Sequence, residues 1–312
     1  MIPVVDIFAG PGGLGEGFSS VLDIKNRPVF DIALSIEMEP HAFETLKLRT
    51  FYRQFPDGAP REYYQYLKSQ LTREAMYKAY KSEAAISEEI CWNARLGPQG
   101  EKTSAVRSRI DEAIGKQDPW VLIGGPPCQA YSLAGRSRNL GNPNYSAKKD
   151  EKQRLYVEYL QILADHRPAV FIMENVKGLL SATLANEHMF HRIVDDLRLP
   201  AKALARDGRK SRSGLSKGYR IYSLVEQRAF ENGDMKGSVI RAEKYGVPQC
   251  RHRVILLGIR DDLDHVTPGI LKEQSEVSVA SVLDDLPPLR SGLSQQADSA
   301  SSWKACLRSQ SN

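Results

Sequence analysis

The chain has 312 residues, of which 41% are hydrophobic and 26% are charged, with a formal net charge of +5, a composition typical of an ordinary soluble globular protein. No run is long and apolar enough to span a membrane, and the first residues show no signal-peptide pattern, so the sequence predicts a cytoplasmic protein. The cysteines are widely separated and show neither C-x-x-C spacing nor nearby histidine pairs, which argues against a metal site or a disulfide framework: Cys91, Cys128, Cys250 and Cys306.

The chain begins with a predicted strand that runs into a glycine-rich turn. Gly10, Gly12 and Gly15 form a G-x-G-x-x-G pattern, whose glycines permit a tight turn and close approach of the backbone to a nucleotide-like ligand at the start of a helix. A second predicted strand, 32–36, ends in Glu37, whose carboxylate can accept hydrogen bonds from both hydroxyls of a ribose. These features fit either a dinucleotide or S-adenosylmethionine.

A long segment, residues 51–115, follows a predicted helix that begins near Pro40. It is too long for a single crossover between strands, so we predict a helical insertion. Aromatic and cationic side chains together can stack on nucleic acid, but a solvated helical hairpin with its tyrosines packed inward is the favoured interpretation. The tyrosines concerned are Tyr63, Tyr64, Tyr66, Tyr77 and Tyr80.

The predicted strand 120–123 leads directly to Pro126-Pro127-Cys128-Gln129, which places a cysteine at the tip of a buried strand. A thiolate attacks well where a strand end and its loop hold it rigid, partly exposed and in electropositive surroundings. A lone cysteine near a turn is ordinarily a core or loop residue, but the segments before and after it favour a nucleophile. The loop that follows, 135–150, is rich in Gly, Asn, Ser and charge and is predicted to be mobile.

Another apolar strand, 169–173, follows a predicted helix over 153–165 and ends in Glu174. Such a glutamate can be a solvated edge residue. In an open parallel sheet, however, ligands collect outside the carboxyl ends of the strands. We therefore expect Glu37, Cys128 and Glu174 to face one crevice.

Two basic segments come later in the chain. Residues 206–218 are basic and flexible, and are either a phosphate-binding loop or only a solvated one. In the second segment, Gln249, Arg251 and Arg253 alternate, so on an extended chain they share one face and run directly into a strand. The alternative is a basic strand edge that discourages pairing with another sheet.

The order of strands and helices predicts an α/β fold with a doubly wound, mostly parallel sheet. Residues 1–290 are predicted to form the catalytic and cofactor-binding domain, and the Ser- and Gln-rich segment 291–312 a flexible tail or linker. Residues 261–312 carry four basic and eight acidic side chains, which leaves a net charge of +9 on residues 1–260 and is consistent with a polyanionic partner. Strands are predicted at 3–8, 32–36, 120–123, 169–173, 219–225 and 253–259.

Taken in order, these segments resemble the cytosine-C5 DNA methyltransferase family over roughly residues 1–290. The resemblance implies the Rossmann-like fold of S-adenosylmethionine-dependent methyltransferases, S-adenosylmethionine as cofactor, duplex DNA as substrate, and a bacterial or phage restriction-modification setting. The motifs that carry it are Phe8-Ala9-Gly10-x-Gly12-Gly13, Pro127-Cys128-Gln129, Glu174-Asn175-Val176 and Gln249-x-Arg251-x-Arg253.

The resemblance also implies a mechanism. Cys128 adds to C6 of a cytosine that is flipped out of the duplex, so that C5 can attack the methyl group, and flipping costs a few kcal/mol in methyltransferases as a class. Glu174 holds N3 and the exocyclic amine, Arg253 bonds the O2 side, and Arg251 steadies the loop or a phosphate.

Further roles follow only from the resemblance. Phosphate and displaced-strand contacts fall to the loop after the cysteine and to the later glutamine, namely Gln129, Ser132, Arg136, Arg138 and Gln249. The cofactor is expected to contact Phe8, Ala9, Gly10, Gly12, Gly13, Leu14, Glu37 and Pro126.

Two departures from the family pattern stand out. The Gly-Asp pair whose acid receives the adenine amine is absent, and Leu96-Gly97-Pro98-Gln99 occupies the approximate region, so the adenine contact stays unassigned. Neither a target-recognition domain nor the C-terminal Gly-Asn motif is evident after Pro287. This suggests either a truncated chain or the catalytic subunit of a split enzyme with a second polypeptide.

Three alternatives remain open at this point. The chain could be a catalytically silent DNA-binding remnant, or a relative that acts on RNA, since no motif reports a 2′-hydroxyl. A nicotinamide-dependent dehydrogenase is supported only by the glycine turn and Glu37, and gives no joint role to Cys128, Glu174 and the two arginines.

Overall fold

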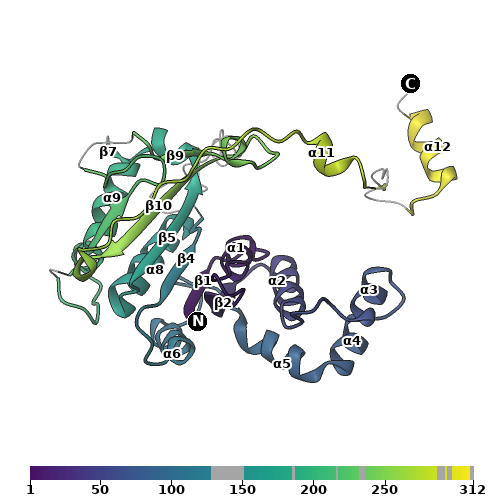
Figure 1. Ribbon diagram of the computed structural model, residues 1–312, viewed down its shortest axis with the longest axis horizontal. Helices are drawn as coiled ribbons and strands as arrows, with labels where there is room; N and C mark the ends of the chain where they lie inside the picture. Colours follow the sequence, from purple (N-terminus) through teal and green to yellow (C-terminus); the bar gives the residue numbers. More distant parts are fainter. Residues whose placement is uncertain are drawn as a thin grey trace.

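A mixed sheet forms the centre of the molecule (Figure 1). The computed structural model describes residues 1–127, 151–184, 187–215, 217–231, 236–286, 292–293 and 297–309. Within these residues the strands follow one another across the sheet in the order β3-β2-β1-β4-β5-β10-β8, and β9 also pairs with β10. Their bounds are β1 Ile2–Ile7, β2 Phe30–Glu37, β3 Cys91–Asn93, β4 Val121–Gly124, β5 Val170–Val176, β8 Tyr219–Tyr222, β9 Val239–Arg241 and β10 His252–Arg260.

The sheet is parallel on one side and antiparallel on the other. Strands β1 to β5 pair in parallel, whereas β10 runs antiparallel to β5, β8 and β9. The strand order reverses between β1 and β4, the position where open α/β sheets bind ligands beyond the carboxyl ends of their strands. The predicted α/β class with a mostly parallel sheet is therefore confirmed. A separate two-stranded ribbon consists of β6 Thr183–Leu184 and β7 Glu187–His188.

Helices cover both faces of the sheet because successive residues of each strand point to opposite sides. On β1, Val5 belongs to a large core that includes Ile110 of α6 and Leu163 of α8, whereas Val4 packs with Leu14 of α1. The first face is covered by α6 Thr103–Ile114, α8 Glu151–His166, α9 Met189–Arg198 and α10 Pro200–Arg206. The other carries α1 Gly13–Ser19, α2 Pro40–Tyr52 and α5 Lys81–Ile90.

A helical arm extends from the β3 end of the sheet, built from α3 Arg61–Leu67, α4 Arg73–Ala79 and α5 (Figure 1). Its own small core surrounds the fully buried Phe51 and Met76, and four tyrosines pack against it: Tyr63, Tyr66, Tyr77 and Tyr80. Tyr64 is 47% exposed. The structure thus favours inward packing of most of these rings. The arm is narrower than the predicted insertion 51–115, because β3 and α6 belong to the central sheet and its core.

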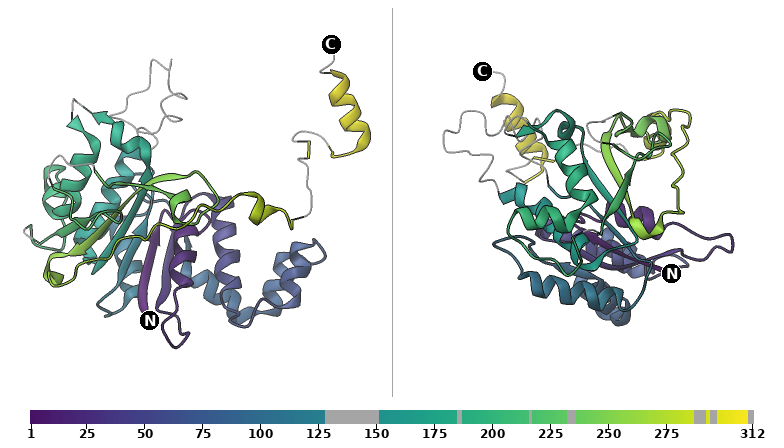
Figure 2. Two further views of the ribbon diagram at one scale, coloured as in Figure 1. Left: turned by 45° about the horizontal axis from the view of Figure 1, so that its top comes forward. Right: turned by 90° about the vertical axis from the view of Figure 1, so that its left-hand side faces the viewer.

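The chain leaves the sheet after β10. A short 3-10 turn, η5 Asp261–Leu263, is followed by an exposed segment that includes α11 Ala280–Leu283, and Figure 1 and the left view of Figure 2 place α12 Ala300–Ser309 away from the sheet. Within the predicted flexible tail, α12 is thus helical, while the division at residue 290 stays a prediction. Among the described residues, no helix combines the length and apolarity needed to cross a membrane.

Candidate active site at the carboxyl end of the sheet

The glycine turn leaves β1 in a conformation that few side chains adopt. Phe8, Gly10 and Gly12 all have positive φ, at 56°, 57° and 90°. A Cβ atom at Gly12 would lie 2.9 Å from Cδ1 of Leu46, so both φ and space require glycine there. Phe8 is not a glycine, and residues held in this region cluster at ligand sites. Its ring packs against the core on the α6 face.

Glu37 ties the end of β2 to this turn. Its Oε2 accepts the Gly10 N–H at 2.7 Å and its Oε1 accepts the Glu39 N–H at 2.7 Å, with 9% of the residue exposed. A carboxylate offers about four acceptor positions, so two remain for further donors such as ribose hydroxyls.

Asn93 is a site residue that the sequence interpretation missed. It ends β3 in register with Glu37, and its Nδ2 donates to the Glu37 carbonyl at 2.9 Å. The strand tip beside the candidate ribose site is therefore Asn93 and not the Leu96 to Gln99 segment. A three-residue strand shows no periodicity, so no pattern in the sequence marked this position.

Asp6 lies beneath the turn and is completely buried. Among the described residues neither of its carboxyl oxygens has a hydrogen-bond partner, and a Cβ atom at Gly15 would lie 3.2 Å from Oδ2. Burial raises the pKa of Asp6 to about 7, because the nearby Gly15 amide and Arg53 offset the loss of solvation only in part. The Asp6 carboxyl group under the glycine turn therefore keeps its proton up to a pH of about 7.

The second half of the site is an ion pair beside residues 125–127, a Gly-Pro-Pro segment after β4 that we call the proline turn. Glu174 Oε1 lies 2.7 Å from Nε of Arg253, whose Nη1 donates to the His252 carbonyl at 2.8 Å. A Cβ atom at Gly125 would lie 3.1 Å from Glu174 Oε2, so the carboxylate reaches the backbone that leads to Pro126 and Pro127. Because β5 continues to Val176, Glu174 lies inside the strand and not at its tip.

The Gln-Arg-Arg segment differs from the predicted extended strand. β10 begins only at His252, and Gln249 lies in a bend where its N–H bonds the Val247 carbonyl at 2.7 Å. Pro248, which cannot donate to a ladder, precedes that bend. Gln249 and Arg251 are exposed, and only Arg253 reaches Glu174.

The basic segment 206–218 lies at the opposite end of the sheet, before β8. Arg209 pairs with Glu158 at 2.8 Å, Arg212 pairs with Asp111 at 2.8 Å, and Arg206 pairs with the buried Asp196. Carboxylates thus compensate these arginines, and they lie away from the carboxyl end of the sheet.

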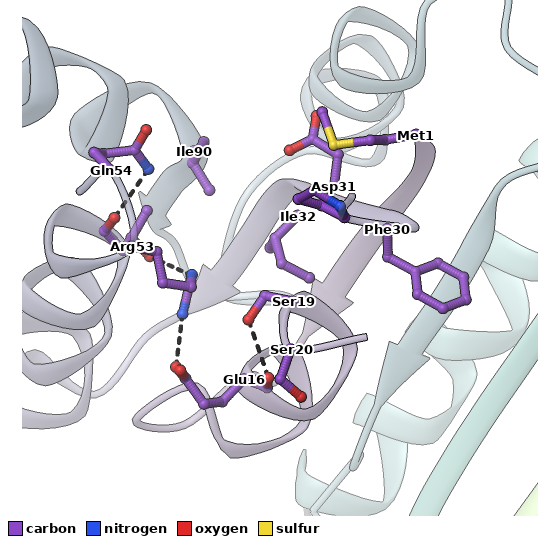
Figure 3. A pocket seen from close by; sticks show the side chains of 12 residues that line it. Met1, Glu16, Ser19, Ser20, Phe30, Asp31, Ile32, Arg53, Gln54 and Ile90 are labelled. Atoms are coloured by element: carbon purple, nitrogen blue, oxygen red, sulfur yellow. Dashed lines mark hydrogen bonds and ion pairs between the residues drawn. The ribbon is translucent and has the colours of Figure 1, made fainter. Parts of the chain in front are cut away.

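A cavity of about 300 Å³ also lies away from the candidate site (Figure 3). It is bounded by α1, the amino half of β2 and the end of α2, and Figure 3 shows Arg53 pointing toward Glu16. Arg53 Nη1 bonds Glu16 Oε2 at 3.0 Å, and its Nη2 bonds Oγ1 of Thr50 at 2.9 Å. None of the predicted cofactor residues lines this cavity.

With this geometry established, comparison with known proteins decides the family. The sequence model described as C-5 cytosine-specific DNA methylase matches residues 90–199 and 224–311. The chain belongs to this family.

Two relatives of this chain are informative. It is 29% identical over 307 residues to the Type II methyltransferase M.Bpa9945I of Bacillus paralicheniformis, covering 92% of this chain and 61% of that protein. It is 27% identical over 290 residues to the DNA-cytosine methyltransferase of Escherichia coli K12, covering 90% of this chain and 48% of that protein. The chain therefore spans between 48% and 61% of the length of these two relatives.

A solved structure supports the fold. It is a prophage-encoded Escherichia coli chain described as a DNA modification methyltransferase, with a TM-score of 0.50 at 18% identity, covering 94% of this chain and 57% of that chain. This likeness confirms the Rossmann-like methyltransferase fold. The family match includes the proline turn, Glu174 and Arg253 but begins after the glycine turn, and it extends past residue 290 to 311.

The chain thus brings most of its described candidate residues to one end of the sheet. The turn from Phe8 to Leu14 follows β1, Glu37 ends β2, Pro126 follows β4, and Glu174 meets Arg253. Among the described residues, no group of three or more His, Cys, Asp or Glu side chains could hold a metal ion. Five predicted residues lie outside the described part of the chain, namely Cys128, Gln129, Ser132, Arg136 and Arg138.

Proposed function

We propose that this methylase transfers a methyl group from S-adenosylmethionine to C5 of a flipped-out cytosine in duplex DNA. The observation that carries the proposal is the Glu174–Arg253 ion pair beside Gly125, three residues before Cys128. It supplies an acceptor and donors for a pyrimidine edge next to a candidate nucleophile. A restriction-modification role in the cytoplasm, as the names of Type II relatives suggest, is part of the same proposal.

The chemistry requires a nucleophile because C5 of an electron-poor cytosine ring does not attack a methyl donor. The Cys128 thiolate forms a bond to C6, and the C5–C6 π electrons become available at C5 as an enamine. C5 would then form a bond to the methyl carbon of S-adenosylmethionine as the S–CH₃ bond breaks, and S-adenosylhomocysteine would leave as the neutral thioether. Loss of the C5 proton to a base and departure of the thiolate from C6 restore the aromatic ring.

Glu174 and Arg253 bind the base in this proposal. Glu174 holds a proton at N3 as negative charge develops there and accepts a hydrogen bond from the exocyclic amine. The Arg253 guanidinium has five N–H groups, so its contact with Glu174 leaves donors for O2 of the cytosine. Because the two side chains come from adjacent strands, β5 and β10, their spacing is set by the sheet.

The described residues fit the cofactor. The glycine turn allows close approach of a ligand, Glu37 retains acceptor positions for ribose hydroxyls, and Phe8 and Pro126 provide apolar walls. Asn93 stands at the strand tip next to Glu37, and we assign the adenine amine to its amide oxygen. Ala9, Gly10, Gly13 and Leu14 surround the methionine part.

DNA is proposed to lie across the exposed Gln249 and Arg251, and to contact Gln129, Ser132, Arg136 and Arg138 as the family resemblance implies. Contacts to phosphate would offset part of the few kcal/mol needed for flipping. Base readout by a recognition domain on a second polypeptide, or on a longer form of the chain, remains part of the proposal. Because the chain belongs to the DNA methylase family, the dehydrogenase alternative is dropped.

The proposal is tested by covalent trapping. Residues 1–312, alone and with a companion chain from the same locus, are incubated with S-adenosylmethionine and duplex DNA that contains 5-fluorocytosine. Fluorine at C5 blocks the final proton loss, so a protein–DNA adduct should accumulate in the wild type and in Cys306→Ser but not in Cys128→Ser. Adduct formation that persists in Cys128→Ser would refute the assignment, and trapping without the companion would remove the need for one.

A further inference from the structure

The parallel ladder between β4 and β5 stops at the proline turn. Its last paired residues are Gly124 and Met173, so the register places Pro126 opposite Asn175. Proline has no backbone N–H, which means that neither Pro126 nor Pro127 can donate to the neighbouring strand. The backbone of the two prolines can therefore be fastened to β5 only through their carbonyl groups.

Asn175 provides such an attachment. Its Nδ2 donates to the Pro126 carbonyl at 3.3 Å, and only 4% of the residue is exposed. Its Oδ1 accepts the N–H of Val176 at 2.9 Å. Because a backbone N–H can only donate, this bond fixes which amide atom is the oxygen and turns the NH₂ group toward the turn.

The amide is chemically specific at this position. An aspartate of the same shape could accept the Val176 N–H but would place its second oxygen against the Pro126 carbonyl. An aliphatic residue would leave both the carbonyl and the N–H without this partner in a buried place, which is costly. Of these three side chains, only the amide serves a donor and an acceptor at once.

The side chains of Glu174 and Asn175 lie on opposite faces of β5. Burial alternates along the strand, with Phe171, Met173 and Asn175 buried and Glu174 half-buried beside Arg253. The carboxylate therefore faces the proposed base site from one side of the sheet, while the next side chain holds the turn from the other. One strand thereby sets the position of both the Glu174 carboxylate and the backbone leading to Cys128.

We propose that Asn175 is a positioning residue, whose side-chain amide replaces the ladder bond that Pro126 cannot make and fixes the turn that carries Cys128. In this role Asn175 acts through the Pro126 carbonyl. The consequence for methylation rests on the proposed function, whereas the attachment itself does not.

The experiment compares three Asn175 variants with a matched control. Asn175→Ala removes the amide, Asn175→Asp keeps its shape without the donor, and Asn175→Ser keeps a shorter donor. The control is Gln161→Ala, because Gln161 is also 4% exposed and its Nε2 donates to a carbonyl, that of Lys210, at 2.9 Å, but at the amino end of the sheet. All are made in the full chain, with its companion if one is needed.

Two readouts are used. Trapping by 5-fluorocytosine should slow by roughly 10- to 100-fold in Asn175→Ala and Asn175→Asp, in the range of lost positioning of a reacting group, with S-adenosylmethionine affinity within about twofold. The rate of Cys128 alkylation by iodoacetamide at fixed pH, followed peptide by peptide, should differ from the wild-type rate in both variants. Asn175→Ser should be intermediate, and Gln161→Ala should lower the melting temperature but leave both readouts unchanged.

Different experimental results would refute the proposed function and the role of Asn175. If the wild type forms no adduct, the proposed function is wrong, and Cys128 alkylation alone decides the role of Asn175. If the Asn175 variants trap and alkylate as Gln161→Ala does, the positioning role is overturned. Should Asn175→Ala not fold, the isosteric Asn175→Asp and the donor-retaining Asn175→Ser give the same decision.

Discussion

Charged side chains are used differently at the two ends of the central sheet. At the amino end Arg209, Arg212 and Arg260 pair with Glu158, Asp111 and Asp118 at 2.8 to 2.9 Å. At the carboxyl end Glu174 pairs with Arg253 beside the proline turn and His252 lies 2.8 Å from Glu243, whereas the Arg251 side chain makes no ion pair among the residues that the structure describes.

The difference shows why basic composition alone does not locate a polyanion site. Residues 206–218 are among the most basic stretches of the sequence, yet Arg209 and Arg212 hold the loop before β8 to α8 and α6, and Arg206 joins α10 to α9. Phosphate would have to compete with those carboxylates. An exposed arginine without such a partner is better placed to meet DNA, and Arg251 is one.

The largest expected effect concerns Asp6, which is buried near the carboxyl end. Its raised pKa means that between about pH 4 and 7 the unfolded chain has lost the proton while the folded chain keeps it, so the free energy of unfolding falls as pH rises and levels off above 7. Between pH 5 and 8 the free energy of unfolding should fall by about 3 kcal/mol more in the wild type than in Asp6→Asn, measured by urea unfolding. Asp31→Asn, at an exposed position, should not change the profile. An unaltered slope in Asp6→Asn would contradict the assignment.

Glu174→Gln keeps the shape of the side chain but removes its charge and its proton. Single-turnover methylation should drop by about 100-fold, the contribution of a positioned acid, with S-adenosylmethionine affinity nearly unchanged in calorimetry. Glu158→Gln breaks the pair with Arg209 at the amino end and should affect stability alone. A large loss of cofactor affinity with normal chemistry in Glu174→Gln would reverse the role proposed for it.

The smallest expected effect distinguishes the exposed Arg251 from Arg212, which pairs with Asp111. Arg251→Ala should weaken DNA binding for all sequences and reduce the slope of log affinity against log salt by about 1, the signature of one phosphate contact. Arg212→Ala should leave that slope unchanged because Asp111 already engages its guanidinium. Equal slopes for the two variants in a fluorescence titration would remove the distinction between the two ends.

Much of the sheet could be predicted because its inner strands are apolar runs followed by Gly, Pro or acidic residues. β1, β2, β4, β5, β8 and β10 each overlap a predicted strand. β3 and β9 were missed, since three residues cannot show an alternation. The antiparallel direction of β10 also lies beyond local sequence, because direction depends on the path of the connecting chain.

The site was predictable to the extent that its residues sit at strand ends. Resemblance placed Glu174 and Arg253 together although 79 positions separate them, and the structure pairs them. The bend at Gln249, the burial of Asp6 and the Asn175 attachment depend on tertiary neighbours, so no spacing rule predicts them. Asn93 was missed with its strand.

The hydrogen bonds of Glu37 affect the free energy of ligand binding at the glycine turn. Its carboxylate already holds the Gly10 and Glu39 amides, so the glycine turn is rigid before a ligand arrives. The conformational entropy of ordering that turn is lost during folding and does not have to be lost again on association. A ligand that meets the free acceptor positions of Glu37 therefore encounters a preorganised receptor, and its affinity reports its own contacts more than the cost of shaping the site.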